Sequence, residues 1–150
     1  DWACSADGRA RQGSPLPKAS ADGKAAMIDQ TGTSNGVEVS PDQRWLYVNE
    51  SAQRKVWAYP LNDQLETGAK RLLIEFADFG LDGMRCDSNG NLYIARYGKG
   101  TVVKLSPAGA VLKEFNLHGQ FPTNVALSPD ERFLYVTMQR DGSIERIALR

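Results

Sequence analysis

Three copies of one short pattern occur along the chain, and this internal repeat constrains the fold more than any other feature. The copies are SNGVEVSPDQRWLYV at 34–48, LDGMRCDSNGNLYI at 81–94 and PTNVALSPDERFLYV at 122–136. Aligned on Tyr47, Tyr93 and Tyr135, they are spaced by 46 and 42 residues. In each copy an apolar alternation leads through a polar turn into a second alternation, which predicts a β-hairpin.

Further strand patterns follow the first two hairpins, at 55–59, 71–76, 101–105 and 111–115. Four short strands per unit of about 40 to 45 residues are typical of a β-propeller blade. No window keeps the apolar period of an amphipathic helix across several turns. We therefore predict an all-β protein, a β-propeller with about three four-stranded blades of a six-bladed ring. The expected blades cover approximately 30–76, 77–116 and 117–150.

The residues before the first copy carry a weaker pattern. Residues 5–20 are poor in apolar side chains and rich in Gly, Pro and Ser, so we expect an irregular edge or a loop over 1–20. Pro17 also lacks the N–H group that a sheet ladder needs. Residues 20–29, SADGKAAMID, indicate an outer strand of an earlier blade.

The number of blades leaves the ring incomplete, because propellers close with about four to eight blades. The open ends of a half ring would expose strand edges and apolar faces. We expect the missing half-propeller to come from upstream chain or from a second copy.

Charge and composition narrow the range of partners. The 18 Lys and Arg residues balance 18 Asp and Glu residues, so the basic excess that nucleic acid or anionic membranes attract is lacking. The apolar runs are far shorter than a membrane span, and no targeting segment is visible, as expected of a soluble protein. Cys4 and Cys86 fit neither a metal pattern nor a disulfide framework. We expect neither a nucleic-acid nor a membrane partner.

Asn35, Asp82 and Thr123 occupy the same position in the three copies. Because equivalent positions on successive blades face one shared space, their polar groups are expected to converge. An amide oxygen and a carboxylate are hard ligands suited to Ca²⁺ or Mg²⁺ and acceptable to Zn²⁺, while a hydroxyl would contact substrate or a metal-bound water. The alternative is that Asn35-Gly36 and Asp82-Gly83 are simply turn dipeptides.

Three runs, TSNGVEVSPDQRWLYVNESAQRKVWAY, RLLIEFADFGLDGMRCDSNGNLYIARYGKGTVVKLSP and PTNVALSPDERFLYVT, carry a family resemblance. They resemble the second half of the gluconolactonase, senescence marker protein and regucalcin family of six-bladed propellers, over about residues 29–149. The resemblance implies a sugar-lactone hydrolase that holds one divalent cation, Ca²⁺ first, with Zn²⁺ or Mg²⁺ as alternatives. It implies Asn35 and Asp82 as metal ligands. A Glu and a further Asn that also bind metal in the family have no counterpart in this chain.

The expected chemistry is polarisation of the lactone carbonyl by the metal, which also activates water, with Asp82 as ligand and base. Residues 32–36 match Gly-x-Ser-x-Gly, but no helical pattern follows them as a nucleophile elbow requires, which disfavours a serine hydrolase. Glu50 and Arg96 follow the second strands of their blades, and we expect them on neighbouring loops as substrate-binding residues together with Thr123. Their alternative role is that of solvated loop residues, and His118 is expected in an exposed loop. The alternative function is a non-catalytic calcium-binding or interaction propeller.

Overall fold

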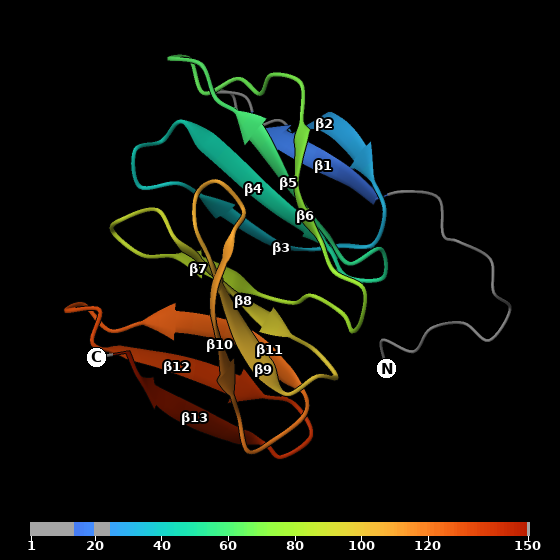
Figure 1. Ribbon diagram of the computed structural model, residues 1–150. Coiled ribbons are helices and arrows are strands. Elements are labelled where there is room, and N and C mark those ends of the chain that lie inside the picture. The colour runs from blue at the N-terminus through green and yellow to red at the C-terminus, as the bar shows by residue number, and fades with distance from the viewer. Residues whose placement is uncertain (1–13, 20–24, 150) are drawn as a thin grey trace, which may run out of the picture.

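The computed structural model describes residues 14–19 and 25–149, and every regular element in these ranges is a β-strand (Figure 1). The first two strands are β1 (Ser14–Ala19) and β2 (Ala25–Thr31). The next four are β3 (Ser34–Val39), β4 (Trp45–Glu50), β5 (Lys55–Pro60) and β6 (Arg71–Glu75). They are followed by β7 (Met84–Cys86), β8 (Leu92–Arg96), β9 (Thr101–Leu105) and β10 (Val111–Asn116). The last three are β11 (Pro122–Leu127), β12 (Phe133–Met138) and β13 (Ser143–Ala148).

The strands form successive antiparallel sheets that confirm the predicted fold class. Two sheets have four strands, β3 to β6 and β7 to β10, the next has three, β11 to β13, and β1 pairs with β2. Within each four-stranded sheet, neighbours in sequence are neighbours in space, as in a propeller blade. The first strands β3, β7 and β11 contact one another in turn, so they form the inner side of the partial ring (Figure 1).

The segment expected as an irregular edge or loop contains a strand, β1, which was not predicted from the sequence. Its ladder with β2 changes register between Pro15 and Pro17. Pro15 is opposite Gln30 and Pro17 is opposite Met27, so the irregularity falls between the two prolines. Strand β2 overlaps residues 20–29, where an outer strand of an earlier blade was expected. Residues 20–24 of this segment, and residues 1–13 of the expected edge, lie outside the described residues.

The hydrophobic core lies in two layers between adjacent sheets. The first layer contains Tyr47, Val56, Ala58, Leu73, Leu81, Met84, Leu92, Ile94, Val103 and Leu105. The second layer contains Tyr93, Ala95, Val102, Phe115, Val125, Leu134, Val136 and Met138. Successive residues of β8 alternate between the layers, as strand geometry requires, and all five residues of β8 are buried. The β7 to β10 sheet is therefore covered on both faces.

The outer faces of the first and last blades carry the core pattern but remain uncovered in the described structure. Val37 is 57% exposed, whereas Met84 and Val125, at equivalent positions, are 3% and 2% exposed. Tyr135 is 39% exposed, whereas Tyr47 and Tyr93 are 1% and 2% exposed. These two faces therefore have the residue types of a blade interface without a neighbouring blade.

Strand β2 contacts the outer part of the first blade through Asp29. The Tyr59 hydroxyl donates a hydrogen bond to Asp29 Oδ2 at 3.0 Å, and Lys70 Nζ lies 2.6 Å from the same oxygen. These contacts involve strand β5 and the segment before β6, whereas Val37 on the inner strand stays exposed.

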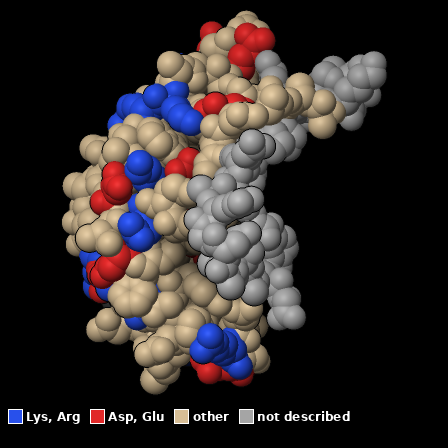
Figure 2. Space-filling view, turned by 90° about the vertical axis from the view of Figure 1, so that its right-hand side faces the viewer, with Lys and Arg blue, Asp and Glu red and all other residues tan. Residues whose placement is uncertain are grey.

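Basic and acidic side chains are interspersed on the face shown in Figure 2, with no patch of a single sign dominating it. This distribution agrees with the balanced composition. The described residues contain no helix, and hence none long and apolar enough to cross a bilayer.

Candidate functional site

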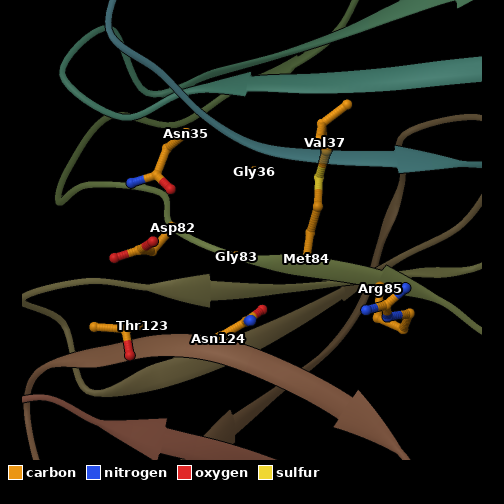
Figure 3. A pocket seen from close by; sticks show the side chains of 9 residues that line it. All are labelled: Asn35, Gly36, Val37, Asp82, Gly83, Met84, Arg85, Thr123 and Asn124. Atoms are coloured by element: carbon orange, nitrogen blue, oxygen red, sulfur yellow. The ribbon is translucent and has the colours of Figure 1, made fainter.

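A polar cavity of about 280 Å³ opens where the inner strands of the three blades meet (Figure 3). It is lined by Asn35, Gly36, Val37, Asp82, Gly83, Met84, Arg85, Thr123 and Asn124. Each blade contributes an equivalent pair, with Asn35, Asp82 and Thr123 as the first members. In Figure 3 these three side chains lie one below another at the same end of the cavity. The structure therefore brings together the candidate metal ligands and one candidate substrate contact.

The three residues differ in their place relative to the strands. Asn35 is the second residue of β3 and Thr123 the second residue of β11, whereas Asp82 precedes β7. The difference arises because β7 is short, which leaves Asp82 and Gly83 outside the regular ladder.

Glycine follows Asn35 and Asp82 because adjacent blades approach closely there. A Cβ atom on Gly36 would lie 2.5 Å from the carbonyl oxygen of Asp82, and one on Gly83 would lie 2.8 Å from that of Thr123. Neither glycine has a positive φ, which hairpin turns built on Asn-Gly or Asp-Gly require. The turn-dipeptide alternative therefore does not explain these two motifs.

Burial of the Asp82 carboxyl raises its pKa to about 6, because the charged form loses hydration. Hydrogen bonds from the Gly83 backbone and the Asn35 side chain favour the ionised form and oppose this rise in the pKa. The Asp82 N–H donates to the Ala95 carbonyl at 2.9 Å, and the Ala95 N–H donates to the Gly83 carbonyl at 3.0 Å. Strand β8 thus fixes the backbone on both sides of the Asp82 side chain.

Two residues near the cavity were not predicted from the sequence. Asn124 follows Thr123 and lines the cavity at the position that glycine occupies in the other two copies. Asn49 is fully buried in β4, where it bonds to the backbones of both Gly36 and Asp82. The signal for Asn49 was an amide at a position where the alternation of β4 predicts a buried side chain.

Glu50 and Arg96 end strands β4 and β8 and are buried, instead of lying on the loops where they were expected. The Glu50 carboxylate accepts a hydrogen bond from the Gly32 N–H at 2.8 Å. An Arg96 nitrogen donates to the backbone carbonyl of Asp78 at 2.6 Å and to the Asp78 carboxylate at 2.7 Å. Neither side chain lines the cavity.

Glu50 and Arg96 are equivalent in the repeat, each lying three residues after the aligned tyrosine. Glu50 fastens the segment that leads to Asn35, and Arg96 fastens the segment that leads to Asp82. The Arg96 guanidinium, 1% exposed, also stacks on the Phe76 ring at 3.9 Å. His118 lies in an exposed loop as predicted, with Nδ1 3.1 Å from a Glu145 carboxylate oxygen.

The side-chain oxygen donors that line the cavity are of the kind that a hard cation binds. One carboxylate, two side-chain amides and one hydroxyl line it, and oxygen ligands of this sort bind Ca²⁺ or Mg²⁺. Within residues 14–19 and 25–149, no group of three or more His, Cys, Asp or Glu side chains gathers at one place. The described part of the chain therefore supplies a single anionic donor, Asp82, to this cavity.

Comparison with known proteins gives consistent matches. Residues 3–140 match the SMP-30/Gluconolactonase/LRE-like region. The 6-deoxy-6-sulfogluconolactonase of Pseudomonas putida is 36% identical over 146 residues, which cover 93% of this chain and 50% of the relative. Pentonolactonase XacC of Haloferax volcanii is 33% identical over 138 residues, covering 81% of this chain and 47% of the relative.

A solved structure shares the fold. The calcium-binding protein regucalcin from Agrobacterium tumefaciens matches with a TM-score of 0.78 and 26% identity, over 87% of this chain and 46% of that chain. The chain spans about half the length of the curated relatives it matches. Since the family match covers most of the 150 residues, the chain belongs to the SMP-30/gluconolactonase/LRE-like family.

Proposed function

We propose that the protein is a hydrolase of sugar lactones that depends on one divalent cation. The observation that carries the proposal is the convergence of Asn35, Asp82 and Thr123 on one small polar cavity (Figure 3). The relatives named as lactonases support the substrate class, a cyclic ester of a sugar acid.

The Asn35 amide oxygen and the Asp82 carboxylate are the groups that would hold the cation. Ca²⁺ is the first candidate because all donors are oxygens, and Zn²⁺ or Mg²⁺ are alternatives. A divalent cation, when bound, polarises a carbonyl oxygen and lowers the pKa of a bound water. Asp82 supplies the negative charge that attracts it.

We assign Asp82 also as the base in hydrolysis. Its carboxylate would accept a proton from the attacking water, whose oxygen bonds to the lactone carbonyl carbon. The ring C–O bond then breaks, and the former ring oxygen takes up a proton to become a hydroxyl of the open-chain acid. Strand β8 holds the backbone on both sides of Asp82, so the carboxylate keeps a fixed place at the cavity.

Thr123 is assigned to substrate contact. Its hydroxyl lies 2.9 Å from the Thr137 hydroxyl and 3.2 Å from the Thr137 carbonyl, and these partners orient it. For Glu50 and Arg96 we propose a supporting role in place of substrate contact. Each fixes the segment that precedes a candidate metal ligand.

We propose further that the active particle contains about six blades. The exposed faces around Val37 and Tyr135, and the half-length match to the relatives, support this. Upstream chain is the favoured source of the missing blades, because β2, which precedes the first blade, already bonds to the outer part of that blade through Asp29. A second copy would bring a complete blade into the same place. The missing blades would also supply the further metal ligands, a Glu and an Asn, that the resemblance implies.

A panel of aldonolactones, assayed with and without a chelator on the protein with its upstream blades, tests the function. Hydrolysis that the chelator abolishes and Ca²⁺ restores is the expected result. Hydrolysis that is insensitive to the chelator would contradict the metal-dependent mechanism.

A second candidate is a calcium-binding or interaction propeller without turnover. The single carboxylate at the cavity favours it, and the matched regucalcin structure is that of a calcium-binding protein. Calorimetric binding of Ca²⁺ combined with no hydrolysis of any lactone in the panel would favour this candidate.

A further inference from the structure

We propose that Asn49 is a positioning residue that fixes the relative position of Asn35 and Asp82 across the boundary between the first two blades. Its effect on metal binding rests on the proposed function. The Asn49 side chain is 0% exposed. Its Oδ1 accepts the Gly36 N–H at 3.0 Å, and its Nδ2 donates to the Asp82 carbonyl at 2.6 Å. One amide thus bonds to the backbone next to Asn35 and to the backbone of Asp82 itself.

The next blade boundary provides an internal comparison. There the Gly83 N–H donates directly to the Thr123 carbonyl at 2.8 Å. Gly83 and Thr123 are the repeat equivalents of Gly36 and Asp82, and the position of Asn49 is occupied by Ala95. At the first boundary the Asn49 amide therefore takes the place of a direct bond between the two backbones. It connects the same donor and the same acceptor through its side chain.

The Asn49 amide is buried in close contact with the second blade. A Cβ atom on Gly36 would lie 2.5 Å from Asn49 Nδ2, and Met84 Sδ lies 3.7 Å from the same nitrogen. Removing the amide would leave the buried Gly36 N–H and the Asp82 carbonyl to find new partners, and buried polar groups without partners are unfavourable. We expect the two backbones to shift, and the Asn35 and Asp82 side chains to move apart with them.

The test compares Asn49→Ala and Asn49→Leu with Asn91→Ala. Leucine fills the volume of the amide without its hydrogen bonds. Asn91 is a matched control, since its side chain also makes hydrogen bonds, to Asp87, but at the opposite end of β8 from the cavity. The readouts are Ca²⁺ affinity by calorimetry, hydrogen exchange of the Gly36 amide, NMR resonances of the Asn35 side-chain amide, and unfolding by urea.

Both Asn49 variants are expected to bind Ca²⁺ about 10- to 100-fold more weakly, the range found for residues that orient metal ligands. They should also lose protection of the Gly36 amide and shift the Asn35 side-chain resonances. Asn91→Ala should lose stability while Ca²⁺ affinity and both NMR signals stay as in the wild type.

The NMR readouts separate this inference from the proposed function. If the wild-type protein binds no divalent cation, the metal proposal fails, while the NMR shifts still decide whether Asn49 positions the pair. Unchanged Gly36 protection and Asn35 resonances in the Asn49 variants would overturn the inference. So would failure of both Asn49 variants to fold when Asn91→Ala folds, because Asn49 would then serve the fold as a whole.

Discussion

Replacing Gly36 with alanine is expected to destabilise the protein although the backbone there does not need glycine's conformational freedom. Gly36 is buried and its φ lies outside the left-handed region. A Cβ atom would lie 2.5 Å from both the Asp82 carbonyl oxygen and Asn49 Nδ2, well inside the roughly 3.5 Å of ordinary contact. The backbone oxygen and the buried amide can both yield only if the blades move.

The expected loss in the free energy of unfolding has two contributions and one offset. Overpacking of a close-packed interior costs about 1–3 kcal/mol. Separation of the blades would weaken the Asn49 hydrogen bonds, and a buried group left without its partner costs about 1–3 kcal/mol. Alanine restricts the unfolded chain, which offsets about 0.4–1 kcal/mol. We expect a net loss of about 2–4 kcal/mol in the free energy of unfolding.

Urea denaturation followed by tryptophan fluorescence measures this loss. Gly142→Ala is the control, because Gly142 has a φ of 56° and an added Cβ atom there would have no other atom within 4 Å. Its cost is conformational strain of about 1–2 kcal/mol. Close contact between the blades at Gly36 is ruled out if Gly36→Ala is within about 0.5 kcal/mol of the wild type, the range of an ordinary surface change.

The remaining predictions concern charge. Asp82→Asn should weaken divalent-cation binding and lower lactone kcat/KM more than Arg96→Ala, because it removes the only carboxylate that lines the described cavity. Equal or reversed losses would count against Asp82 as metal ligand and base. Arg96→Ala should instead lower the free energy of unfolding by about 1–3 kcal/mol in urea titrations, since it removes a buried guanidinium that bonds to Asp78 and stacks on Phe76, and an altered KM at unchanged stability would contradict this. Burial tends to raise the pKa of Asp87, but hydrogen bonds from Asn91 and Lys104 outweigh it and hold that pKa below 3.8. The ionised Asp87 carboxylate therefore stabilises the fold above its unfolded-state pKa, and this stabilisation is lost as the pH falls through its folded-state pKa. Asp87→Asn should flatten the acid limb of a pH–stability profile, and an unchanged limb would contradict this.

The blades could be predicted from sequence because the repeat and the alternation act together. Residues Leu92 to Ala95 of β8 face the two apolar layers alternately. Their continuous apolar run therefore indicates a strand that is buried on both faces. Strand β1 was not predicted because prolines such as Pro15 and Pro17 are typical of a loop. In the structure both have partners on β2, on either side of a register shift. Local sequence does not contain the partner strand that makes this shift possible.

The convergence of Asn35, Asp82 and Thr123 could be expected because equivalent positions of a repeat face the same space. The placement of Arg96 could not, because its guanidinium reaches Asp78 and Phe76 through packing that forms only between strands and loops. The hydrogen-bond partners of Asn49 could not be predicted for the same reason. Its two partners belong to different blades, and Asp82 lies 33 residues along the chain.

The most direct test of the central claim is an anomalous-scattering map from crystals of the protein with its upstream blades, grown with Zn²⁺ in place of Ca²⁺. We expect a single strong peak in the cavity, about 2.0–2.2 Å from an Asp82 carboxylate oxygen, with the Asn35 amide oxygen also directed at it. A peak elsewhere, or an empty cavity in which Asn35 still bonds to the Asp82 carboxylate, would contradict it.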